Sequence, residues 1–284
     1  MVHIVPKSGF ARAYLIYEGE NIMAVDVGSI GTAREIEAYC ADVLRVSTEA
    51  ISFIVATHFH IDHIGGIGTL LRKCSPETQV LFHPLVREYL AGNRELPAMK
   101  NWISGLLPTV VASLSNLKNP ADFTTETLSG IPVMGINGLS HLPYEASIRY
   151  FDAGLLPRYP LGFGPSASSG HRDWEVIATP GHTEDSISLY NNATKELICG
   201  DLIIGNPDGT GHLNTFVQDE IAIRETFVTL KYTISPLSIY PGHGKIIKDH
   251  ENAFRKVRCP ELAVPPAGMV EGGTLSWSKG RKQT

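Results

Sequence analysis

The stretch Thr57-His58-Phe59-His60-Ile61-Asp62-His63 is the most informative part of the sequence, because it holds four candidate metal ligands. An apolar run at residues 51–56 leads into it and predicts a buried β-strand, and residues 67–73 after it favour a helix. The motif is therefore expected on a loop that leaves a strand, where a rigid scaffold can position side chains. Imidazole nitrogens and carboxylate oxygens are ligands for zinc, manganese and iron, so the stretch predicts a metal site.

Three later segments repeat this arrangement of a short apolar strand followed by a glycine-flanked histidine or aspartate. The pairs are 174–178 with His182, 196–199 with Asp201, and 237–240 with His243. Surface histidines are often only solvated, which is the simplest alternative. Four such junctions in one chain are instead typical of ligands that converge on one site.

The ordered set, His-x-His-x-Asp-His at 58–63 and then His182, Asp201 and His243, resembles the metallo-β-lactamase-fold hydrolases over about residues 10–83 and 172–248. The resemblance implies an α+β fold, a four-layer αββα sandwich with the metal site at one edge between the two sheets. The lactamases themselves usually have cysteine or serine where this chain has Asp201. This difference points to the glyoxalase II and lactonase-like branch.

The resemblance also implies two divalent metal ions, with zinc favoured and iron or manganese as alternatives. The implied ligands are His58, His60 and His182 for one ion, Asp62, His63 and His243 for the other, and Asp201 as a bridge. In the resembled family an aspartate at the position of Asp26 usually braces the metal loop. An aspartate that only caps the following turn is an equally good interpretation from sequence.

The implied function is hydrolysis of a small ester-like substrate, which could be a thioester, a lactone or a phosphodiester. A water bound to such ions has its pKa lowered from about 15.7 to near 7, which supplies a bridging hydroxide. Asp62 is expected to orient this hydroxide, and His212 and Tyr144 are candidate leaving-group residues. Thr183 and Asp185 are expected to help only if they face the second ring nitrogen of His182.

Two other functions remain open at this point. An iron-dependent dioxygenase or redox protein can have the same fold, but the flavodiiron relatives carry a flavin domain and a metal-loop glutamate that this sequence lacks. Persulfide dioxygenases keep only one iron. A non-catalytic ligand-binding or signalling protein would not need all seven ligands.

Composition limits the class of protein and its partners. The 284 residues fit one large or two small domains, and we expect a single domain with a helical insertion at about 84–150. A net charge of −5 argues against nucleic acid. The sequence shows neither a signal peptide nor an apolar membrane-spanning run. Four widely spaced cysteines suit a reducing cytoplasm.

The expected insertion follows from spacing, because His182 lies 119 positions after His63. Apolar residues between 102 and 117 recur at helical intervals, with a kink or break expected at Pro108. The insertion could be a lid over the site, a homodimer surface or an extra helical pair on the core. Elsewhere Thr32 and Glu35 suggest a capping box, and residues 152–170 suggest a loop.

Overall fold

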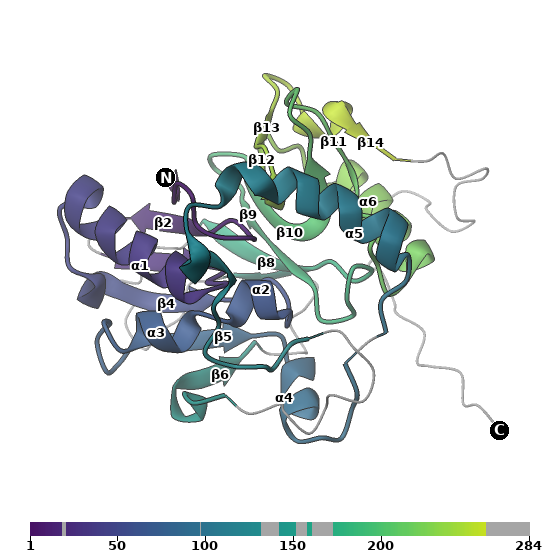
Figure 1. The fold of residues 1–284 in the computed structure, drawn as a ribbon. Helices are drawn as coiled ribbons and strands as arrows, with labels where there is room; N and C mark the ends of the chain where they lie inside the picture. The colour runs from purple at the N-terminus through teal and green to yellow at the C-terminus, as the bar shows by residue number, and fades with distance from the viewer. Residues whose placement is uncertain (19–20, 97, 132–141, 152–157, 161–172, 260–284) are drawn as a thin grey trace.

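Two β-sheets form the centre of the protein in a computed structural model that describes residues 1–18, 21–96, 98–131, 142–151, 158–160 and 173–259 (Figure 1). The first sheet has the order β1-β2-β3-β4-β5-β6, and its strands are Val2–Ile4, Tyr14–Glu18, Asn21–Val25, Ile51–Val55, Gln79–Phe82 and Ile148–Tyr150. The second has the order β13-β12-β10-β9-β8-β7, with β11 on β10 and β14 on β11. Its strands, β7 to β14, are Arg158–Pro160, Trp174–Ala178, Ile187–Asn191, Glu196–Gly205, Gly211–Leu213, Ser238–Gly244, Ile247–Lys248 and Val257–Arg258.

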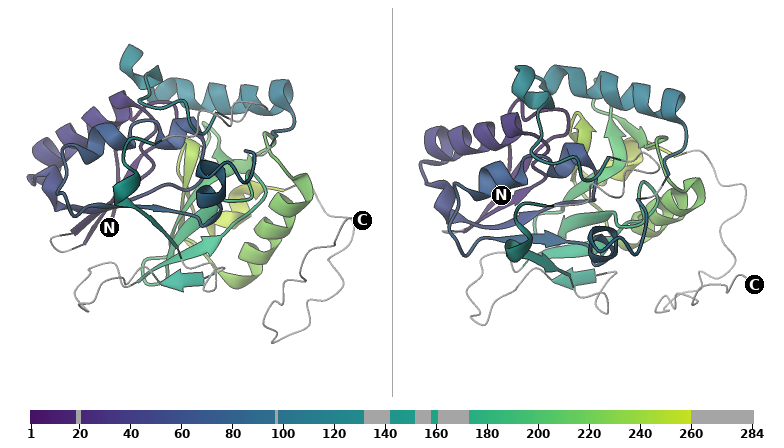
Figure 2. Two further views of the ribbon diagram at one scale, coloured as in Figure 1. Left: turned by 90° about the horizontal axis from the view of Figure 1, so that it is seen from below. Right: turned by 60° about the horizontal axis from the view of Figure 1, so that its bottom comes forward.

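Helices cover the outer faces of both sheets. The α-helices, α1 to α6, are Ile30–Tyr39, Ile61–Ile64, Ile67–Leu71, Leu85–Leu90, Trp102–Ser113 and Glu220–Thr233. Single helical turns lie at Cys40–Leu44, Thr48–Ala50, Leu114–Asn116, Pro120–Phe123, Glu145–Ser147 and Ala253–Lys256. Figure 2 shows the strands lying between α1 on one side and α6 on the other.

Three separate apolar cores correspond to the three interfaces of a four-layer sandwich. One holds Ile36 and Leu70 under the helices of the first sheet, and another holds Phe227 under α6. The third lies between the sheets and includes Tyr14 and the fully buried Trp174. The predicted αββα architecture is therefore confirmed, since each sheet buries one face on helices and the other on its partner sheet.

The pairing of the first sheet brings candidate residues to one edge. Strands β3, β4 and β5 are parallel neighbours, so their carboxyl ends meet on the same side. Asp26 follows β3 directly, the 57–63 motif follows β4, and His83 follows β5. The carboxyl ends of parallel strands are where ligand sites form in open α/β sheets.

The second sheet supplies its ligands differently from the sequence prediction. Asp201 and His243 do not follow strands but lie inside β10 and β12, which are parallel neighbours. The register between these strands shifts on both sides of Gly200, whose φ is +49°. A bulge of this kind redirects a side chain without ending the strand.

Two further expectations need correction. Helix α1 begins after Ser29, whose hydroxyl accepts from the backbone N–H of Thr32, so Thr32 lies within the helix and is not its cap. Helix α5 continues through Pro108 from Trp102 to Ser113, so of the kink or break expected there the break does not occur. The predicted loop at 152–170 lies outside the described residues except for β7.

Helix α5 belongs to the predicted insertion and lies across the second sheet. It contacts β12 and β10, the strands that carry His243 and Asp201 (Figure 1). Within the described part of the chain, no helix is long and apolar enough to cross a membrane.

Candidate metal centre

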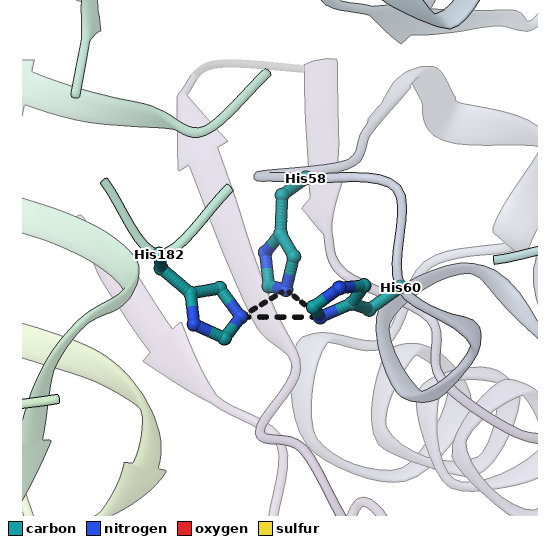
Figure 3. A group of neighbouring side chains, drawn as sticks. All are labelled: His58, His60 and His182. Carbon is teal, nitrogen blue, oxygen red and sulfur yellow. Dashed lines mark hydrogen bonds between the residues drawn. The ribbon is translucent and has the colours of Figure 1, made fainter. Parts of the chain in front are cut away.

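Three histidine side chains converge from the two sheets on one point (Figure 3). His58 Nε2 lies 3.1 Å from His60 Nδ1, and His182 Nε2 lies 3.2 Å and 3.1 Å from these two atoms. Two nitrogens bound tetrahedrally to one zinc ion, each at about 2.0–2.1 Å, would lie about 3.4 Å apart. The spacing of this first group therefore matches the ligands of a single metal ion.

Asp62, His63 and His243 form a second group beside the first. Asp62 Oδ2 lies 3.8 Å from His63 Nε2 and 3.4 Å from His243 Nε2. Asp201 lies between the groups, because its Oδ2 is 3.5 Å from His182 Nε2 and 3.2 Å from His243 Nε2, while its Oδ1 is 3.3 Å from His63 Nε2. The structure thus brings together all seven predicted ligands, with Asp201 where a bridge would be required.

The hydrogen bonds of His182 and His63 fix which ring nitrogen faces the centre with a lone pair. His182 Nδ1 lies 2.7 Å from the carbonyl oxygen of Phe216, which can only accept a hydrogen bond. His63 Nδ1 lies 2.9 Å from Asp26 Oδ2, an acceptor of the same kind. Both Nδ1 atoms must therefore carry the proton, and both Nε2 atoms are free to bind a metal.

The same reasoning applies to His58 through Thr57. The Thr57 hydroxyl donates to Asp26 Oδ2 at 2.9 Å, so its oxygen accepts from His58 Nδ1 at 3.2 Å. His60 instead faces the centre with Nδ1, and among the described residues its buried Nε2 has no hydrogen-bond partner. Every histidine of the first group can thus present an unprotonated nitrogen to the centre.

Buried polar atoms without partners provide an independent test of whether a metal fits. His63 Nε2, His243 Nε2 and Asp201 Oδ1 are buried and make no hydrogen bond within the described residues. Burying such atoms unsatisfied is costly, and a metal ion would satisfy the two ring nitrogens and the carboxylate oxygen together. The donor set of five imidazoles and two carboxylates fits divalent ions such as zinc, iron and manganese.

The electrostatics of the metal-free centre reflect the same crowding of ligands. Burial, reinforced by His182, lowers the pKa of His60 to about 3. Burial would also lower the pKa of His243, but Asp201 and Asp62 outweigh it and raise that pKa to about 9. For Asp62 burial acts upward, yet His63 and His243 bring its pKa down to about 2. Burial also acts upward on Asp201, yet His243 and His63 hold its pKa well below the usual range, so both carboxylates remain ionised at neutral pH and are available as ligands.

The residues expected to support the ligands divide into two groups. Asp26 braces the metal loop as expected in the resembled family, since it also accepts from the backbone N–H of Thr57 at 2.8 Å. The second nitrogen of His182 faces the Phe216 carbonyl and not Thr183 or Asp185, so the condition for their expected role is not met. Asp185 instead accepts from the backbone N–H of Phe59 at 2.8 Å, and Thr183 lies 2.8 Å from the Ser186 hydroxyl. Asp185 therefore fixes the backbone of the metal loop.

The two candidate leaving-group residues do not join the centre. His212 lies on β11, where its Nδ1 contacts Asn206 Oδ1 at 2.9 Å, and it lines a hollow that none of the seven ligands reaches. Tyr144 is buried in the core of the first sheet and packs beside Gly68. Neither contacts a ligand, so nothing in the structure supports a catalytic role for them. His83, which follows β5, is a structural residue of this edge, because its Nδ1 accepts from the backbone N–H of Leu85.

Several residues around the centre were missed from sequence. Ser113 of α5 lies 2.7 Å from His243 Nδ1, and Phe10 packs edge-on against the His243 ring. The Phe216 carbonyl and Asn214, whose Nδ2 lies 3.3 Å from His182 Nδ1, surround the other histidine. Ser113, Asn214 and Phe216 lie 32 to 130 positions from the histidines they contact, and Phe10 is farther still from His243. None of them belongs to a local sequence motif.

Comparisons with known proteins agree with the fold and the centre. Residues 8–258 match the sequence profile of the metallo-beta-lactamase superfamily, and the chain belongs to this superfamily of metal-dependent hydrolases. An archaeal superfamily protein from Sulfolobus tokodaii shares the fold, with a TM-score of 0.50 and 16% identity over 87% of this chain and 81% of that one.

The chain also matches curated relatives, and it covers different shares of their lengths. A "Beta-lactamase-like protein 2 homolog" from Drosophila melanogaster is 24% identical over 238 residues, which are 84% of this chain and 60% of the relative. A "Probable metallo-hydrolase" from Bacillus subtilis is 24% identical over 87% of this chain and 71% of its own length. Another from Methanocaldococcus jannaschii is 27% identical over 83% of this chain and 88% of its own length. The chain thus spans only part of the fly protein.

Proposed function

We propose that this chain is a dinuclear metal-dependent hydrolase that acts on a small ester-like substrate, namely a thioester, a lactone or a phosphodiester. The observation that carries the proposal is the position of Asp201, whose carboxylate lies within 3.5 Å of His182 from one ligand group and of His63 and His243 from the other. One carboxylate shared by two complete ligand groups suits two neighbouring ions. In the proposed assignment, His58, His60 and His182 hold the first ion, Asp62, His63 and His243 hold the second, and Asp201 bridges them.

The chemistry that two divalent ions supply when bound is activation of water at neutral pH and polarisation of the bond under attack. The protein contributes the rest through orientation. Four ligand histidines each donate a hydrogen bond from Nδ1 to an acceptor of the protein, which fixes the orientation of the ring. They are His58, His63, His182 and His243. Preorganised groups of this kind need no rearrangement during the reaction.

Asp62 is the proposed catalytic residue. Its side chain is 25% exposed, whereas the other six ligands are buried, so it is the ligand that a water molecule or substrate can reach. From this position its carboxylate would orient the attacking water and transfer a proton to the leaving group. His212 and Tyr144 have no part in the proposal.

Zinc is the metal we propose, because imidazole and carboxylate ligands suit it well, although iron and manganese accept the same set. Cys40, Cys74 and Cys199 form no disulfide within the described residues, and we propose a location in the cytoplasm, where thiols are kept reduced. A small-molecule substrate is also proposed over nucleic acid, given the net charge of −5.

The proposal is tested by measuring the metal content of the purified protein together with hydrolysis of thioester, lactone and phosphodiester substrates. Close to two zinc or manganese ions per chain and hydrolysis of one substrate class are expected. His182→Ala should lose one ion and most activity, whereas His250→Ala, at a histidine that is 87% exposed, should change neither. One iron per chain with oxygen uptake on persulfide would instead establish the redox alternative. Full metal content and activity in His182→Ala would refute the ligand assignment.

A further inference from the structure

Helix α5 contacts both halves of the candidate metal centre, although it lies in the insertion and contributes none of the seven ligands. Near its C-terminal end the Ser113 hydroxyl lies 2.7 Å from His243 Nδ1. Nearer its start, Gly105 packs on the backbone of Phe216, so closely that a Cβ atom there would lie 2.6 Å from the Phe216 nitrogen. The two contacts are two helical turns apart on one element.

The hydrogen bonds of the Ser113 hydroxyl determine whether Nδ1 of His243 carries a proton. A serine hydroxyl has a single proton, and the carbonyl oxygen of Thr109 accepts it at 2.9 Å. The hydroxyl oxygen can then only accept from His243, so Nδ1 of His243 carries the ring proton that faces it. Ser113 is fully buried and His243 is 1% exposed, so water does not compete for this bond. His243 Nε2 is thereby directed at Asp62 and Asp201.

The other contact of α5 acts through the segment that orients His182. The Phe216 carbonyl accepts from His182 Nδ1, and the Phe216 N–H donates to Asn214 Oδ1 at 2.9 Å. Immediately before α5, the N–H of Lys100 donates to the carbonyl of Val217 at 2.7 Å. The peptide that fixes His182 is thus held between the start of the insertion helix and Asn214. Only glycine at position 105 permits this approach.

We propose that α5 is a positioning element for both metal ions: Ser113 holds His243 in the orientation that binds the second ion, and Gly105 keeps the Phe216 carbonyl on His182 for the first. This inference rests on the proposed dinuclear function. It assigns the insertion a role inside the centre, distinct from a lid that only covers it. It also implies that one helix aligns ligands from two parts of the second sheet, His182 in the loop after β8 and His243 within β12.

The experiment compares two variants of α5 with a matched control in the full chain. Zinc affinity is measured by competition with a chromophoric chelator for each ion separately, using His182→Ala to isolate the second ion and His243→Ala to isolate the first. Ser113→Ala should weaken the second ion about 10- to 100-fold and leave the first unchanged, the usual effect of losing a partner of a ligating histidine. Gly105→Ala should show the opposite selectivity.

The control variant is Ser104→Ala, at an exposed serine of the same helix, and it should change neither affinity. Alanine favours helix more than serine or glycine does, so neither test substitution lowers the intrinsic helix propensity of α5. Equal weakening of both ions by Ser113→Ala, or unchanged affinities in both test variants, would overturn the proposal.

A second measurement separates this inference from the proposed function. The buried Nδ1–H of His243 should give a slowly exchanging proton resonance in ¹H–¹⁵N spectra, with or without metal. Ser113→Ala should lose the protection of this resonance, and Ser104→Ala should keep it. If the wild-type chain binds no zinc, the proposed function fails, whereas the resonance still reports on Ser113. A resonance equally protected in Ser113→Ala would refute the role of the hydroxyl.

Discussion

Hydrogen bonding decides which atom of each histidine faces the candidate metal centre. A carbonyl, a carboxylate and two hydroxyls each occupy one ring nitrogen of a histidine, and the other nitrogen remains free. His60 differs because its Nδ1 faces the centre, while its buried Nε2 has no partner in the part of the chain that the structure describes. The spacing His-x-His predicts that both side chains face the same way, but it does not predict that they use different nitrogens.

Asp26 is the supporting residue whose loss should be most visible in metal binding. In Asp26→Asn the amide oxygen can still accept from Thr57, but the amide NH₂ would then face His63 Nδ1, which also donates. The ring would be driven toward the tautomer with its proton on Nε2, where the ion binds. We expect the second ion to bind about 10- to 100-fold more weakly, measured by chelator competition.

Asp42→Asn is the control for this substitution, since Asp42 is exposed on the turn after α1. It should bind zinc as the wild type does. If Asp26→Asn and Asp42→Asn have the same zinc affinity, the bond from Asp26 does not determine the tautomer of His63.

Asp185 should make stability depend on pH. Burial raises the pKa of Asp185 to about 6. The folded state therefore binds a proton more readily than the unfolded state between about pH 4 and pH 6, and stability falls as the pH rises through this window. Each pKa unit corresponds to about 1.4 kcal/mol, so the loss should be about 3 kcal/mol.

Asp185→Asn keeps an acceptor for the Phe59 N–H but removes the buried charge. Urea unfolding of the metal-free protein at a series of pH values should show the variant gaining about 3 kcal/mol relative to wild type between pH 4 and pH 7. A difference between the two proteins that does not change with pH would show that Asp185 is not the titrating group.

At the scale of elements, the sequence predicts what is local and misses what depends on distant neighbours. The strand before each ligand loop is recognisable because β-branched and apolar residues continue to the motif, as in Ile51–Val55. The bulge that keeps Asp201 within β10 depends on pairing with β12, and the Ser113 contact joins residues 130 positions apart. His212 lies near Asp201 in sequence, yet β11 takes it to the Asn206 turn.

The outer face of α5 leads to a prediction about association. Ile103, Leu107 and Val111 of α5 and Leu114 of the turn that follows it are 87%, 60%, 56% and 59% exposed and recur at helical spacing, and α5 carries no charged residue. A two-fold dimer places the same surface on both sides, so two such stripes would bury each other without burying charge. We therefore predict a homodimer that forms through the insertion.

Light scattering coupled to size exclusion should give a dimer mass for the wild-type chain and a monomer mass for Val111→Glu. Val43→Glu is a closely matched control, because Val43 is also a valine that is 56% exposed, on the turn after α1. A monomeric wild type, or dissociation by both substitutions alike, would refute dimerisation through α5.

For the whole molecule, the candidate centre lies where the two halves of the chain meet. The Tyr14 hydroxyl donates to the carbonyl of Pro241 at 2.6 Å, and the N–H of Ile187 donates to the carbonyl of Thr57 at 2.8 Å. Gly242 has no room for a side chain, because a Cβ atom would collide with Asp201 and lie 2.9 Å from the His63 ring. Ligands from both halves therefore reach their positions only when the sheets are packed together.

Because the ligands come from both sheets, metal removal should destabilise the whole protein and not only one loop. An ion that binds only the folded state stabilises it by about 4 kcal/mol at a free concentration 1,000 times its dissociation constant. At roughly 2–4 °C per kcal/mol for a chain of this size class, chelation should lower the melting temperature by about 10 °C. Calorimetry should show one transition in both states if residues 1–284 form a single domain, as predicted.

Two histidine variants test whether the rise in melting temperature on adding zinc comes from ions bound at the candidate centre. His182→Ala removes a ligand supplied by the second half of the chain, so zinc should raise its melting temperature by much less than that of the wild type. His250→Ala removes an exposed histidine and should retain the full shift. If zinc stabilises His182→Ala and the wild type equally, the ions do not join the two sheets through this site, and the assigned ligands would have to be abandoned.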